Sequence, residues 1–499
     1  MSIVVNQVRP SFYMDSVALM RCSREIVAMS GVEDAALMMG TPANLRIMAD
    51  AGILAEHGEA AGAGDLVIAI RAIHEGVAKT AMSDALAFLD QPAKRQQSGA
   101  TWQPKTLRAG MKAMPDANLA LISVPGDYAA AEARKALNHG LNVMIFSDNV
   151  TIQAEIALKQ QAREAGLLVM GPDCGTAIIS GVPLAFANKV PEGDIGIIGA
   201  SGTGIQEVSC QIARHGKGIS HAIGVGGRDL KAEVGGTTTL MALDVMEADP
   251  TTTHIILISK PPASTVAARV MARIGESSKT FTICFIGGDE VRVPANARLA
   301  PTLRDCARMA TGLDPIADDP GPNAKAGTGF SERREIRGLF AGGTLCSEAQ
   351  VIMKKAGLKI ASNVPIPDAD RLDANTLERH QLIDLGDDEY TQGRPHPMID
   401  PSVRDQALSE AFRDPRVGVV LLDIVLGYGS HRDPAGHVAN FLKDRAADGR
   451  LIVASVTGTD QDPQQATAQI QKLERVGVNV APSNADAVFL AINRLSQRQ

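Results

Sequence analysis

Two segments of this chain share a pattern in which a short apolar strand runs through small residues into a helix. The first is 194–208, DIGIIGASGTGIQEV, and the second is 336–348, IRGLFAGGTLCSE. Such a turn belongs to a layered α/β fold, and it leaves the first backbone N–H groups of its helix unpaired. These donors and the positive end of the helix dipole favour an anion, usually a phosphate group.

We expect the two turns to face each other across one anionic ligand. The residues that would hold its phosphate group are Ser201, Gly202, Thr203, Gly342, Gly343 and Thr344. Many strand–glycine–helix turns bind nothing, because glycine there also allows close packing of helix on strand. Neither turn is a Walker A loop, since no Gly-Lys-Ser or Gly-Lys-Thr follows, and neither has the GxGxxG spacing of a dinucleotide site.

Composition excludes several classes of protein. A chain of 499 residues with 45% hydrophobic and 21% charged residues is typical of a globular protein of about three domains. A net charge of −7 and 3% aromatic residues disfavour nucleic-acid binding. No apolar run approaches the ~20 residues of a membrane helix, and the N-terminus does not resemble a signal peptide. The scattered cysteines indicate reduced thiols in the cytoplasm and no metal motif.

Strands alternate with helices along the chain, which predicts parallel sheets with right-handed crossovers. Polar or Pro/Gly-rich segments at 91–108 and 314–332 predict boundaries. The expected domains cover residues 1–105, 106–190, 191–325 and 333–499. The first reads as a small α/β domain with βαβαβα order. Ligands of such sheets bind beyond the carboxyl ends of the strands, where the last domain carries polar turns.

Several segments resemble the succinyl-CoA synthetase superfamily of acyl-CoA ligases, from about residue 115 to 499. VPGDYAAAEARKALNHGLNVMIFSDNV and AREAGLLVMGPDCG are similar to its CoA-binding domain, while GIIGASGTGIQEV and GLFAGGTLCSEA resemble the two helix starts that bind its phosphoryl group. The whole chain resembles the FdrA proteins, most specifically in RPSFYMDSVALM, GLFAGGTLCSEAQ, RPHPMIDPSVR and DIVLGYGSHRDP. The resemblance implies a Rossmann-like CoA-binding-type domain at 106–190 and two flavodoxin-like ligase-type domains at 191–325 and 333–499.

The chain departs from the acyl-CoA ligases at positions that matter for chemistry. These ligases carry a GHAGA segment whose histidine becomes phosphorylated, whereas this chain has IGGDE after the strand at 280–285. The sequence also shows no ATP-grasp domain and no glycine loop to hold CoA. These departures weigh against nucleotide-driven thioester formation and against CoA as a cofactor. Glu207, which matches the acidic residue beside the missing histidine, has lost that partner.

The resemblance to FdrA proteins implies a different reaction, the oxamate carbamoyltransferase of anaerobic allantoin degradation, a step in purine catabolism. That enzyme converts oxalurate and phosphate into oxamate and carbamoyl phosphate with two companion subunits, so we expect an oligomer. The reaction needs a firmly held phosphate and a donor on the developing oxyanion. Two alternatives stay open: a subunit of a nucleotide-dependent acyl-CoA synthetase, and a non-catalytic scaffold that binds CoA or phosphate.

The remaining candidate residues follow from the charge of the substrates. Arginine is the natural bidentate partner of the carboxylate in oxalurate and oxamate. The candidates for that contact are Arg394, Arg432 and Arg228. His396 or His431 could move the proton at the amide nitrogen, and Glu207 is the third catalytic candidate. Alternatively, His396 only stiffens a turn between two prolines. Asp423 could orient a histidine or cap the loop that follows it.

Overall fold

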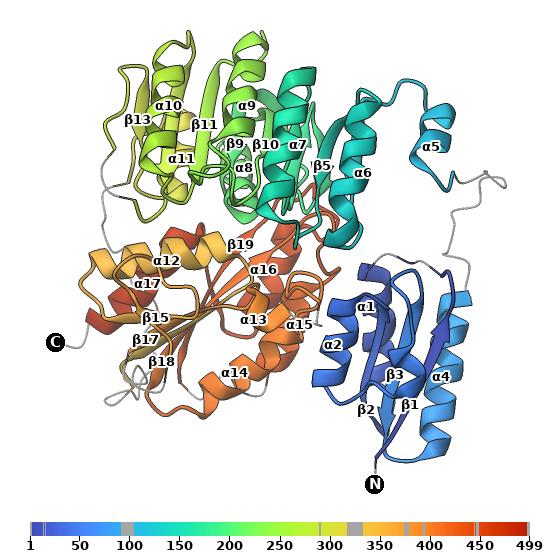
Figure 1. The fold of residues 1–499 in the computed structure, drawn as a ribbon. Coiled ribbons are helices and arrows are strands. Elements are labelled where there is room, and N and C mark those ends of the chain that lie inside the picture. The colour runs from blue at the N-terminus through green and yellow to red at the C-terminus, as the bar shows by residue number, and fades with distance from the viewer. Residues whose placement is uncertain are drawn as a thin grey trace. The chain divides into compact units, whose positions relative to one another are not determined.

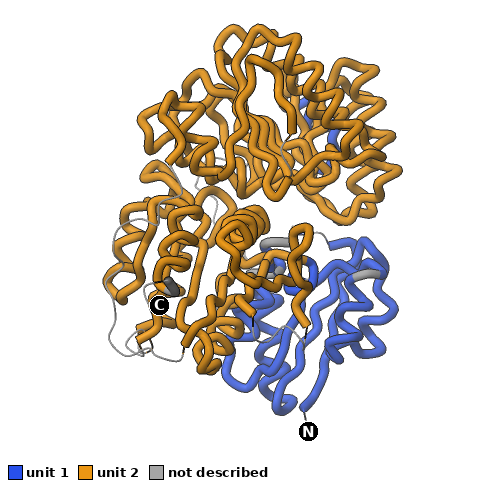
Figure 2. Tube along the Cα trace, turned by 90° about the vertical axis from the view of Figure 1, so that its left-hand side faces the viewer, with its two compact units in different colours: residues 1–113, 388–395 blue, residues 114–387, 396–499 orange. Residues whose placement is uncertain are grey.

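The structure is a computed structural model. It describes residues 2–12, 14, 16–90, 104–288, 291–316, 333–373, 379–391, 395–443, 445 and 449–496. The chain divides into two compact units, drawn in blue and orange in Figure 2. Unit 1 comprises Met1–Ala113 and Asp388–Pro395, and unit 2 comprises Met114–Asp387 and His396–Gln499. Arg394, together with most of both predicted linkers, lies outside the described residues.

Unit 1 contains a small three-stranded sheet with the strand order β1-β3-β2. Its elements are β1 (Ile3–Arg9), α1 (Ser16–Val27), β2 (Val32–Met39), α2 (Pro42–Asp50), α3 (Glu56–Glu59), β3 (Leu66–Ala72), α4 (Glu75–Asp90) and α5 (Leu107–Ala113). The predicted alternation of strands and helices is confirmed. Both strand pairs are antiparallel. The central strand of this sheet is β3, whose residues Leu66–Ile70 are fully buried.

Unit 2 begins with a three-stranded parallel sheet of order β4-β5-β6. Its elements are β4 (Leu119–Ile122), α6 (Gly126–Asn138), β5 (Asn142–Ile145), α7 (Ile152–Ala165) and β6 (Val169–Met170). The next strands, β7 (Thr176–Ile179) and β8 (Val182–Ala185), form a hairpin that pairs with the following sheet. They therefore lie in a different sheet from the rest of the predicted domain 106–190. Ser180 and Gly181 both have positive φ angles, as a two-residue hairpin turn requires.

The second sheet of unit 2 has seven strands in the order β13-β12-β11-β9-β10-β7-β8. Its further elements are β9 (Glu192–Gly199), α8 (Gly202–Arg214), β10 (Ile219–Gly224), α9 (Thr237–Ala248), β11 (His254–Ser259), α10 (Ser264–Gly275), β12 (Thr280–Phe285), β13 (Ala297–Leu299) and α11 (Leu303–Ala310). The strands β9 to β13 have the order of flavodoxin, in which the switch point lies between the first and third strands. The turn after β9 therefore stands at this switch point.

The third sheet repeats this plan with seven parallel strands in the order β16-β15-β17-β14-β18-β19-β20. Its elements are β14 (Glu335–Phe340), α12 (Gly343–Lys355), β15 (Ile360–Ser362), β16 (Asp370–Arg371), β17 (His380–Asp384), α13 (Asp388–Thr391), α14 (Val403–Arg413), β18 (Val417–Val425), α15 (Pro434–Leu442), β19 (Leu451–Thr457), α16 (Ala466–Arg475), β20 (Asn479–Ala481) and α17 (Asn484–Ser496). Without β15 and β16 at its edge, the order is again that of flavodoxin. The turn after β14 stands at the second switch point.

Helices α8, α11, α12 and α17 join the two seven-stranded sheets of unit 2 (Figure 1). One continuous apolar core runs through this contact, since Ile205 and Val208 belong to the same buried cluster as Leu345 and Val488. The predicted α/β class with several parallel sheets and a small N-terminal α/β domain is confirmed. The domain boundaries themselves stay predictions.

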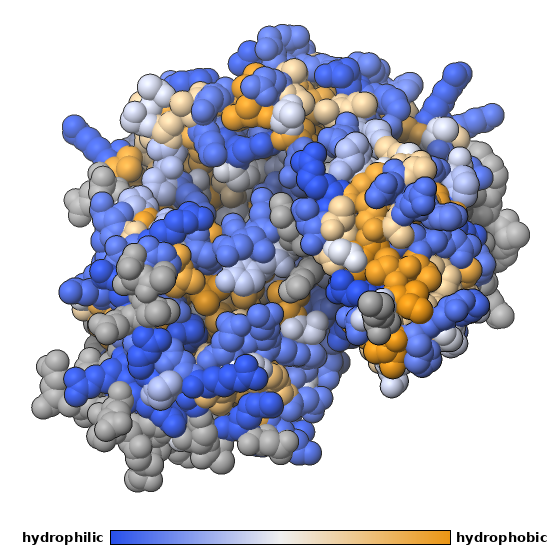
Figure 3. All heavy atoms as spheres, turned by 60° about the horizontal axis from the view of Figure 1, so that its bottom comes forward, coloured by the Kyte–Doolittle hydropathy of each residue, from blue (hydrophilic) through white to orange (hydrophobic). Residues whose placement is uncertain are grey.

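The face of the molecule in Figure 3 is mostly hydrophilic. Large apolar side chains that remain exposed come from separate elements, for example Tyr128 in α6, Val182 in β8 and Val245 in α9. None of the described helices combines the length and the apolar character needed to cross a membrane. All six cysteines are free and buried, which agrees with the expectation of reduced thiols.

A buried ion pair links the first sheet of unit 2 to the second. The Lys159 Nζ on α7 lies 2.7 Å from Asp229 Oδ1 and 2.9 Å from Glu155 Oε1, and all three side chains are at most 1% exposed. Removing one partner of such a pair typically costs ~3–5 kcal/mol, because the other charge stays buried. We expect Lys159→Met to destabilise unit 2 by this amount in urea unfolding monitored by circular dichroism.

The matched control is Lys135→Met on α6, which removes an exposed pair with Glu132. Exposed pairs contribute little to stability, so this variant should unfold at nearly the wild-type midpoint. Equal midpoints for the two variants would contradict the structural importance of Lys159.

Candidate functional site

The two predicted turns meet in the structure. The hydroxyl groups of Ser201 and Thr344 are directly hydrogen-bonded to each other. A β-carbon built on Gly342 would stand 3.1 Å from Thr203 Cγ2. The start of α8 therefore packs against the start of α12, at the carboxyl ends of β9 and β14. This contact joins the switch points of the two sheets.

Both helix starts keep unpaired backbone donors. Ser201 caps α8, where its Oγ accepts the Gly204 N–H at 2.9 Å. The N–H groups of Gly202, Thr203, Gly343 and Thr344 have no acceptor among the described residues. Gly202, Thr203 and Gly343 are only partly buried. Donors of two helix ends are thus available to one anion. Phosphate binding by these residues stays a prediction.

The contacts of Asp423 differ from both predictions, which were that it orients a histidine or caps the loop that follows it. Its carboxylate accepts the N–H groups of Ala341 and Gly342, each at 2.7 Å, and the Arg404 Nη2 at 2.7 Å. It thereby caps the turn before α12, because β18 is the neighbour of β14 in the sheet. The N–H of Gly342 is consequently not free for a phosphate group. Burial raises the pKa of Asp423 in spite of these donors.

A second carboxylate lies on the other side of β14, at the end of β17. The Oδ1 of Asp384 accepts the Gly386 N–H at 2.9 Å. Its Oδ2 lies 2.6 Å from the position of a β-carbon built on Gly343. Burial raises the pKa of Asp384 to about 7. Asp384 is not among the candidate residues predicted from the sequence, although it ends an apolar strand in the segment LIDLGDDEY.

His396 lies beside Asp384. A β-carbon built on Gly386 would stand 2.6 Å from His396 Nε2, 2.8 Å from Ala341 O and 3.2 Å from Asp384 Oδ1, so these atoms converge on one spot. The His396 Nδ1 accepts the Met398 N–H at 3.2 Å, which assigns the hydrogen of the neutral ring to Nε2. Burial lowers the pKa of His396 to about 4. At neutral pH this side chain is therefore a neutral donor.

Lys260 adds a cation that the sequence analysis also missed. It follows β11, the strand on the other side of the first switch point, and it is exposed. Its charge lowers the pKa of Asp384, against the larger effect of burial. The site therefore combines groups from both seven-stranded sheets.

Other predicted residues lie elsewhere or are occupied. The Arg228 Nε pairs with Glu155 Oε2 at 2.9 Å, and its Nη2 donates to Val150 O at 2.8 Å. The guanidinium of Arg228 thus binds both α7 and the end of the loop that precedes α7. Arg432 is exposed, and no contact with either turn is recorded for it among the described residues.

His431 belongs to a loop that pairs with the segment after His396. Its backbone N–H donates to Met398 O at 2.7 Å, and its Nδ1 accepts the Asp433 N–H at 3.0 Å. The second contact fixes the ring within its own loop. No contact between this imidazole and the two turns is recorded in the described part of the chain.

Glu207 is buried between the two sheets and does not face an open site. Its carboxylate accepts hydrogen bonds from Thr457 Oγ1, from Gln211 Nε2 at 3.1 Å and from Asn484 N at 3.3 Å. The side chain is 1% exposed. The structure thus gives Glu207 a role in joining α8 to β19 and α17, in place of the predicted catalytic role.

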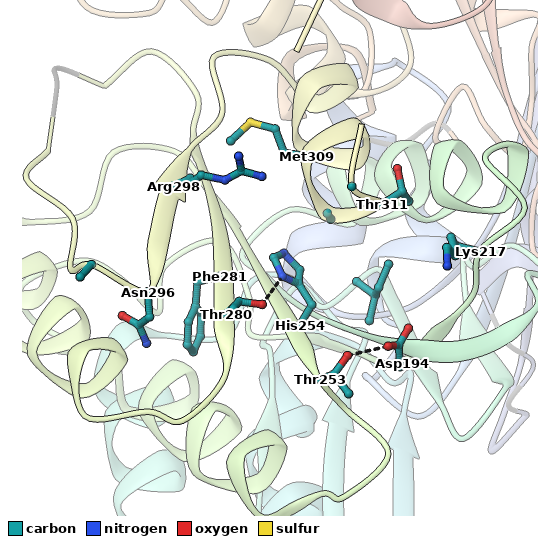
Figure 4. Close-up of a pocket in the computed structure, with 14 residues that line it drawn as sticks. Asp194, Lys217, Thr253, His254, Thr280, Phe281, Asn296, Arg298, Met309 and Thr311 are labelled. Carbon is teal, nitrogen blue, oxygen red and sulfur yellow. Dashed lines mark hydrogen bonds between the residues drawn. The ribbon is translucent and has the colours of Figure 1, made fainter. Parts of the chain in front are cut away.

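A cavity of about 560 Å³ lies at the opposite edge of the second sheet, at the amino ends of its strands (Figure 4). Its polar groups largely satisfy one another. The two nitrogens of His254 bond to Thr280 and Thr282, and Thr253 bonds to Asp194. The unpaired donors of the two turns make the switch points the better candidate site.

Three family models match the chain. "AllF, heavy metal-associated domain" matches residues 1–105, "CoA binding domain" matches residues 191–287, and "CoA-ligase" matches residues 339–493. The CoA-binding match thus covers strands β9 to β12 of the second sheet of unit 2, whereas the resemblance implied such a domain at 106–190. The last two matches each contain one of the two turns.

The first family name suggests a metal, and the described residues of unit 1 do not fit one. Cys22, the single cysteine of residues 1–113, is buried in α1, and burial raises the pKa of its thiol to about 12. The described residues contain no cluster of three or more His, Cys, Asp or Glu side chains that could hold a metal ion.

The CoA named in the second model is likewise not singled out by these residues. The unpaired N–H groups at the start of α8 suit any phosphate group, and no further contact selects CoA.

Solved structures with a similar course of the chain include PH0766 from Pyrococcus horikoshii OT3, at 15% identity and a TM-score of 0.35 over 81% of this chain and 88% of that one. A dinucleotide-forming acetyl-coenzyme A synthetase 1 of Ca. Korarchaeum cryptofilum has 15% identity and a TM-score of 0.32 over 76% and 83%. At these low scores neither likeness supports a conclusion.

Two relatives are similar to part of the chain. Subunit SauD of the ADP-forming sulfoacetate–CoA ligase of Bilophila wadsworthia is 28% identical over 37% of this chain and 63% of its own length. A succinate–CoA ligase subunit alpha 2 of Archaeoglobus fulgidus is 26% identical over 29% of this chain and 50% of its own length. Both matches cover less than two thirds of these ligase subunits.

A third relative is similar over the whole chain. The YahF protein of Escherichia coli strain K12 is 41% identical over 508 aligned positions, which cover 97% of each protein. Together with the AllF-type, CoA-binding and CoA-ligase domains, this similarity shows that the chain belongs to the FdrA family of the succinyl-CoA ligase superfamily.

Proposed function

We propose that this chain is a subunit of an oxamate carbamoyltransferase, which transfers a carbamoyl group between oxalurate and phosphate in allantoin degradation. The observation that carries the proposal is the meeting of two helix starts at the Ser201–Thr344 contact, with unpaired donors on both helices. Membership of the FdrA family supports it. Phosphate or carbamoyl phosphate is then the ligand of the two turns.

The chemistry needs few groups beyond this. A phosphate oxygen attacks the carbamoyl carbon of oxalurate, and the bond from that carbon to the oxamate nitrogen breaks. The N–H groups of Gly202, Thr203, Gly343 and Thr344 hold the phosphate. The neutral His396 Nε2–H is suited to donate to the developing oxyanion. Binding both anions side by side supplies much of the rate enhancement.

The substrate carboxylate needs a cation that this chain supplies only in part. Lys260 is exposed beside Asp384, whereas the Arg228 guanidinium is paired with Glu155. Arg432 stays a candidate for this contact, as does Arg394, which lies outside the described residues. We propose that companion subunits complete the site in a cytoplasmic hetero-oligomer.

The similarity to subunits of ADP-forming CoA ligases favours one alternative, a nucleotide-dependent acyl-CoA synthetase. Ligases of this superfamily carry a phosphoryl group on a histidine. The histidine beside α12 is His396, whose Nε2 carries the hydrogen because Nδ1 accepts the Met398 N–H. Phosphorylation of Nε2 would first require moving this hydrogen to Nδ1 and losing the contact with Met398. Direct carbamoyl transfer to phosphate avoids this requirement.

The reaction can be tested on the chain purified with its companion subunits. Given oxamate and carbamoyl phosphate, the assembly should form oxalurate and phosphate, measured by liquid chromatography. ADP formation that depends on CoA would favour the ligase. Binding of carbamoyl phosphate without turnover in the complete assembly would favour the scaffold.

Alanine at Gly343 should weaken carbamoyl phosphate binding. The new methyl group would stand 2.6 Å from Asp384 Oδ2, so it displaces either the carboxylate or the start of α12. We expect a loss of tenfold or more in affinity by calorimetry, about 1.4 kcal/mol.

The control is Gly64→Ala, since a β-carbon there meets nothing within 4 Å. This variant should bind carbamoyl phosphate like the wild type. Wild-type affinity in Gly343→Ala would argue against a phosphate site at the two turns.

A further inference from the structure

Carbamoyl transfer moves one proton, and none of the residues assigned so far can carry it. We propose that Asp384 passes this proton from the attacking phosphate to the leaving nitrogen, an inference that rests on the proposed function. The structural basis is that its buried carboxyl group lies against the start of α12, next to the donors that would hold the phosphate.

The backbone of Asp384 is rigidly held at the end of β17. Its N–H donates to Asn363 Oδ1 at 2.9 Å, and its carbonyl oxygen accepts from Asn363 Nδ2 at 2.9 Å. Asn363 is itself buried. On the side chain, the Gly386 N–H fixes Oδ1, which leaves Oδ2 directed at Gly343. A group held from both sides in this way keeps its direction during the reaction.

The position of Oδ2 explains why residue 343 is a glycine. A β-carbon there would stand 2.6 Å from this oxygen and 3.5 Å from the carboxyl carbon. Any side chain at this position would therefore displace the acid. The unpaired N–H groups of Gly343 and Thr344 begin the same helix. A phosphate bound to them lies next to the carboxyl oxygen.

The charged groups around Asp384 come from several elements. Asp387 in the same loop and Asp423 at the end of β18 disfavour its ionised form, while Lys260 after β11 favours it. Burial is the largest effect and disfavours the charge, so the pKa lies at about 7. A bound phosphate dianion adds negative charge and raises the pKa further. The carboxyl group is therefore protonated when the phosphate is in place.

The remaining neighbours do not take over this proton. His396 is neutral, with a pKa lowered to about 4, and its Nδ1 already accepts a hydrogen bond. The Cys346 thiol on α12 is buried, and burial raises its pKa well above the usual value. Asp423 is held by Arg404 and two backbone donors. Among its described neighbours, Asp384 combines a pKa near neutrality with a carboxyl oxygen turned to the helix start. Glu348 on α12 also has a pKa raised to about 7, but its carboxylate accepts hydrogen bonds from Leu303 and Asn484.

With Asp384 as the acid, every bond and proton of the carbamoyl transfer is accounted for. Hydrogen phosphate forms a new O–C bond to the carbamoyl carbon, and the C–N bond to the oxamate nitrogen breaks. Asp384 gives its proton to that nitrogen, which leaves as the amide of oxamate. The proton of the phosphate hydroxyl then returns to Asp384. In the reverse direction the ionised carboxylate takes the proton from the oxamate amide as it attacks carbamoyl phosphate.

The first test measures proton uptake on anion binding and needs no turnover. Sulfate is the probe, because it does not titrate near neutral pH. Calorimetry in buffers of different ionisation enthalpy should give an uptake of about half a proton at pH 7.5, if the bound anion raises the pKa by about one unit. Asp384→Asn should bind sulfate without this uptake. Asp384→Glu, which keeps an acid, should retain part of it.

The matched control is Asp244→Asn on α9, an exposed carboxylate paired with Arg273. It should show the wild-type proton uptake. Thermal melting of each variant checks that it is folded. Absence of sulfate binding, absence of uptake in the wild type, or unchanged uptake in Asp384→Asn would each overturn the proposal.

The second test is the rate of oxalurate formation from oxamate and carbamoyl phosphate between pH 5.5 and 8.5. At carbamoyl phosphate concentrations far below saturation, the wild-type rate should rise through pH 7, because this direction needs the ionised carboxylate and the pKa of the free enzyme then governs the profile. Asp384→Asn should be about 100-fold slower or more, without that rise. Partial recovery in Asp384→Glu supports proton transfer.

The two proposals can fail separately. Oxalurate formation by Asp384→Asn with the wild-type pH profile overturns the role of Asp384 and leaves the carbamoyltransferase standing. Absence of oxalurate formation in the wild-type assembly, with intact proton uptake, overturns the carbamoyltransferase. Asp384 would then remain the titrating group of an anion site.

Discussion

The packing of the two seven-stranded sheets in unit 2 depends on two buried glutamates. Each lies on a helix of one sheet and accepts a hydrogen bond from a helix of the other. Glu348 on α12 accepts the first N–H of α11, from Leu303, at 2.6 Å. Glu207 on α8 accepts the first N–H of α17, from Asn484, at 3.3 Å. Asn484 also donates its side-chain amide to Glu348 Oε2 at 2.7 Å, which connects the two glutamates. Each helix thus satisfies a donor that burial would otherwise leave unpaired.

The hydrogen bonds of these two glutamates fix the positions at which α8 and α12 begin. Both helices start with Gly-Thr, and the glutamate follows five residues after that glycine in each, so the same contact is made twice. With the glutamates engaged, the helix starts meet at Ser201 and Thr344. Asp384 and Asp423, at the ends of the strands on either side of β14, then border the second start. The anion site is a consequence of how two sheets pack.

The local parts of this design are visible in the sequence. The turns after β9 and β14 can be predicted because an apolar run, small residues and a helix lie within one short segment. The residues that lie next to each functional group in space cannot be predicted in this way. Arg228 looked available because its partner Glu155 lies far away in the chain. Glu207 was a catalytic candidate because it matches an acidic residue of the acyl-CoA ligases, and its donors at residues 457 and 484 are not visible locally. Asp384 was missed because burial, which makes its titration unusual, has no local signal.

One crossing of the chain between its units has a consequence for engineering. The chain leaves unit 2 after Asp387, passes through Asp388–Pro395 in unit 1, and returns at His396. Asp384 and His396, two residues of the candidate site, thus lie on either side of this segment in the sequence. A truncated protein that starts at Met114 would keep every strand of unit 2, but it would carry Asp388–Pro395 without the rest of unit 1. The two units therefore cannot be separated by one cut in the sequence.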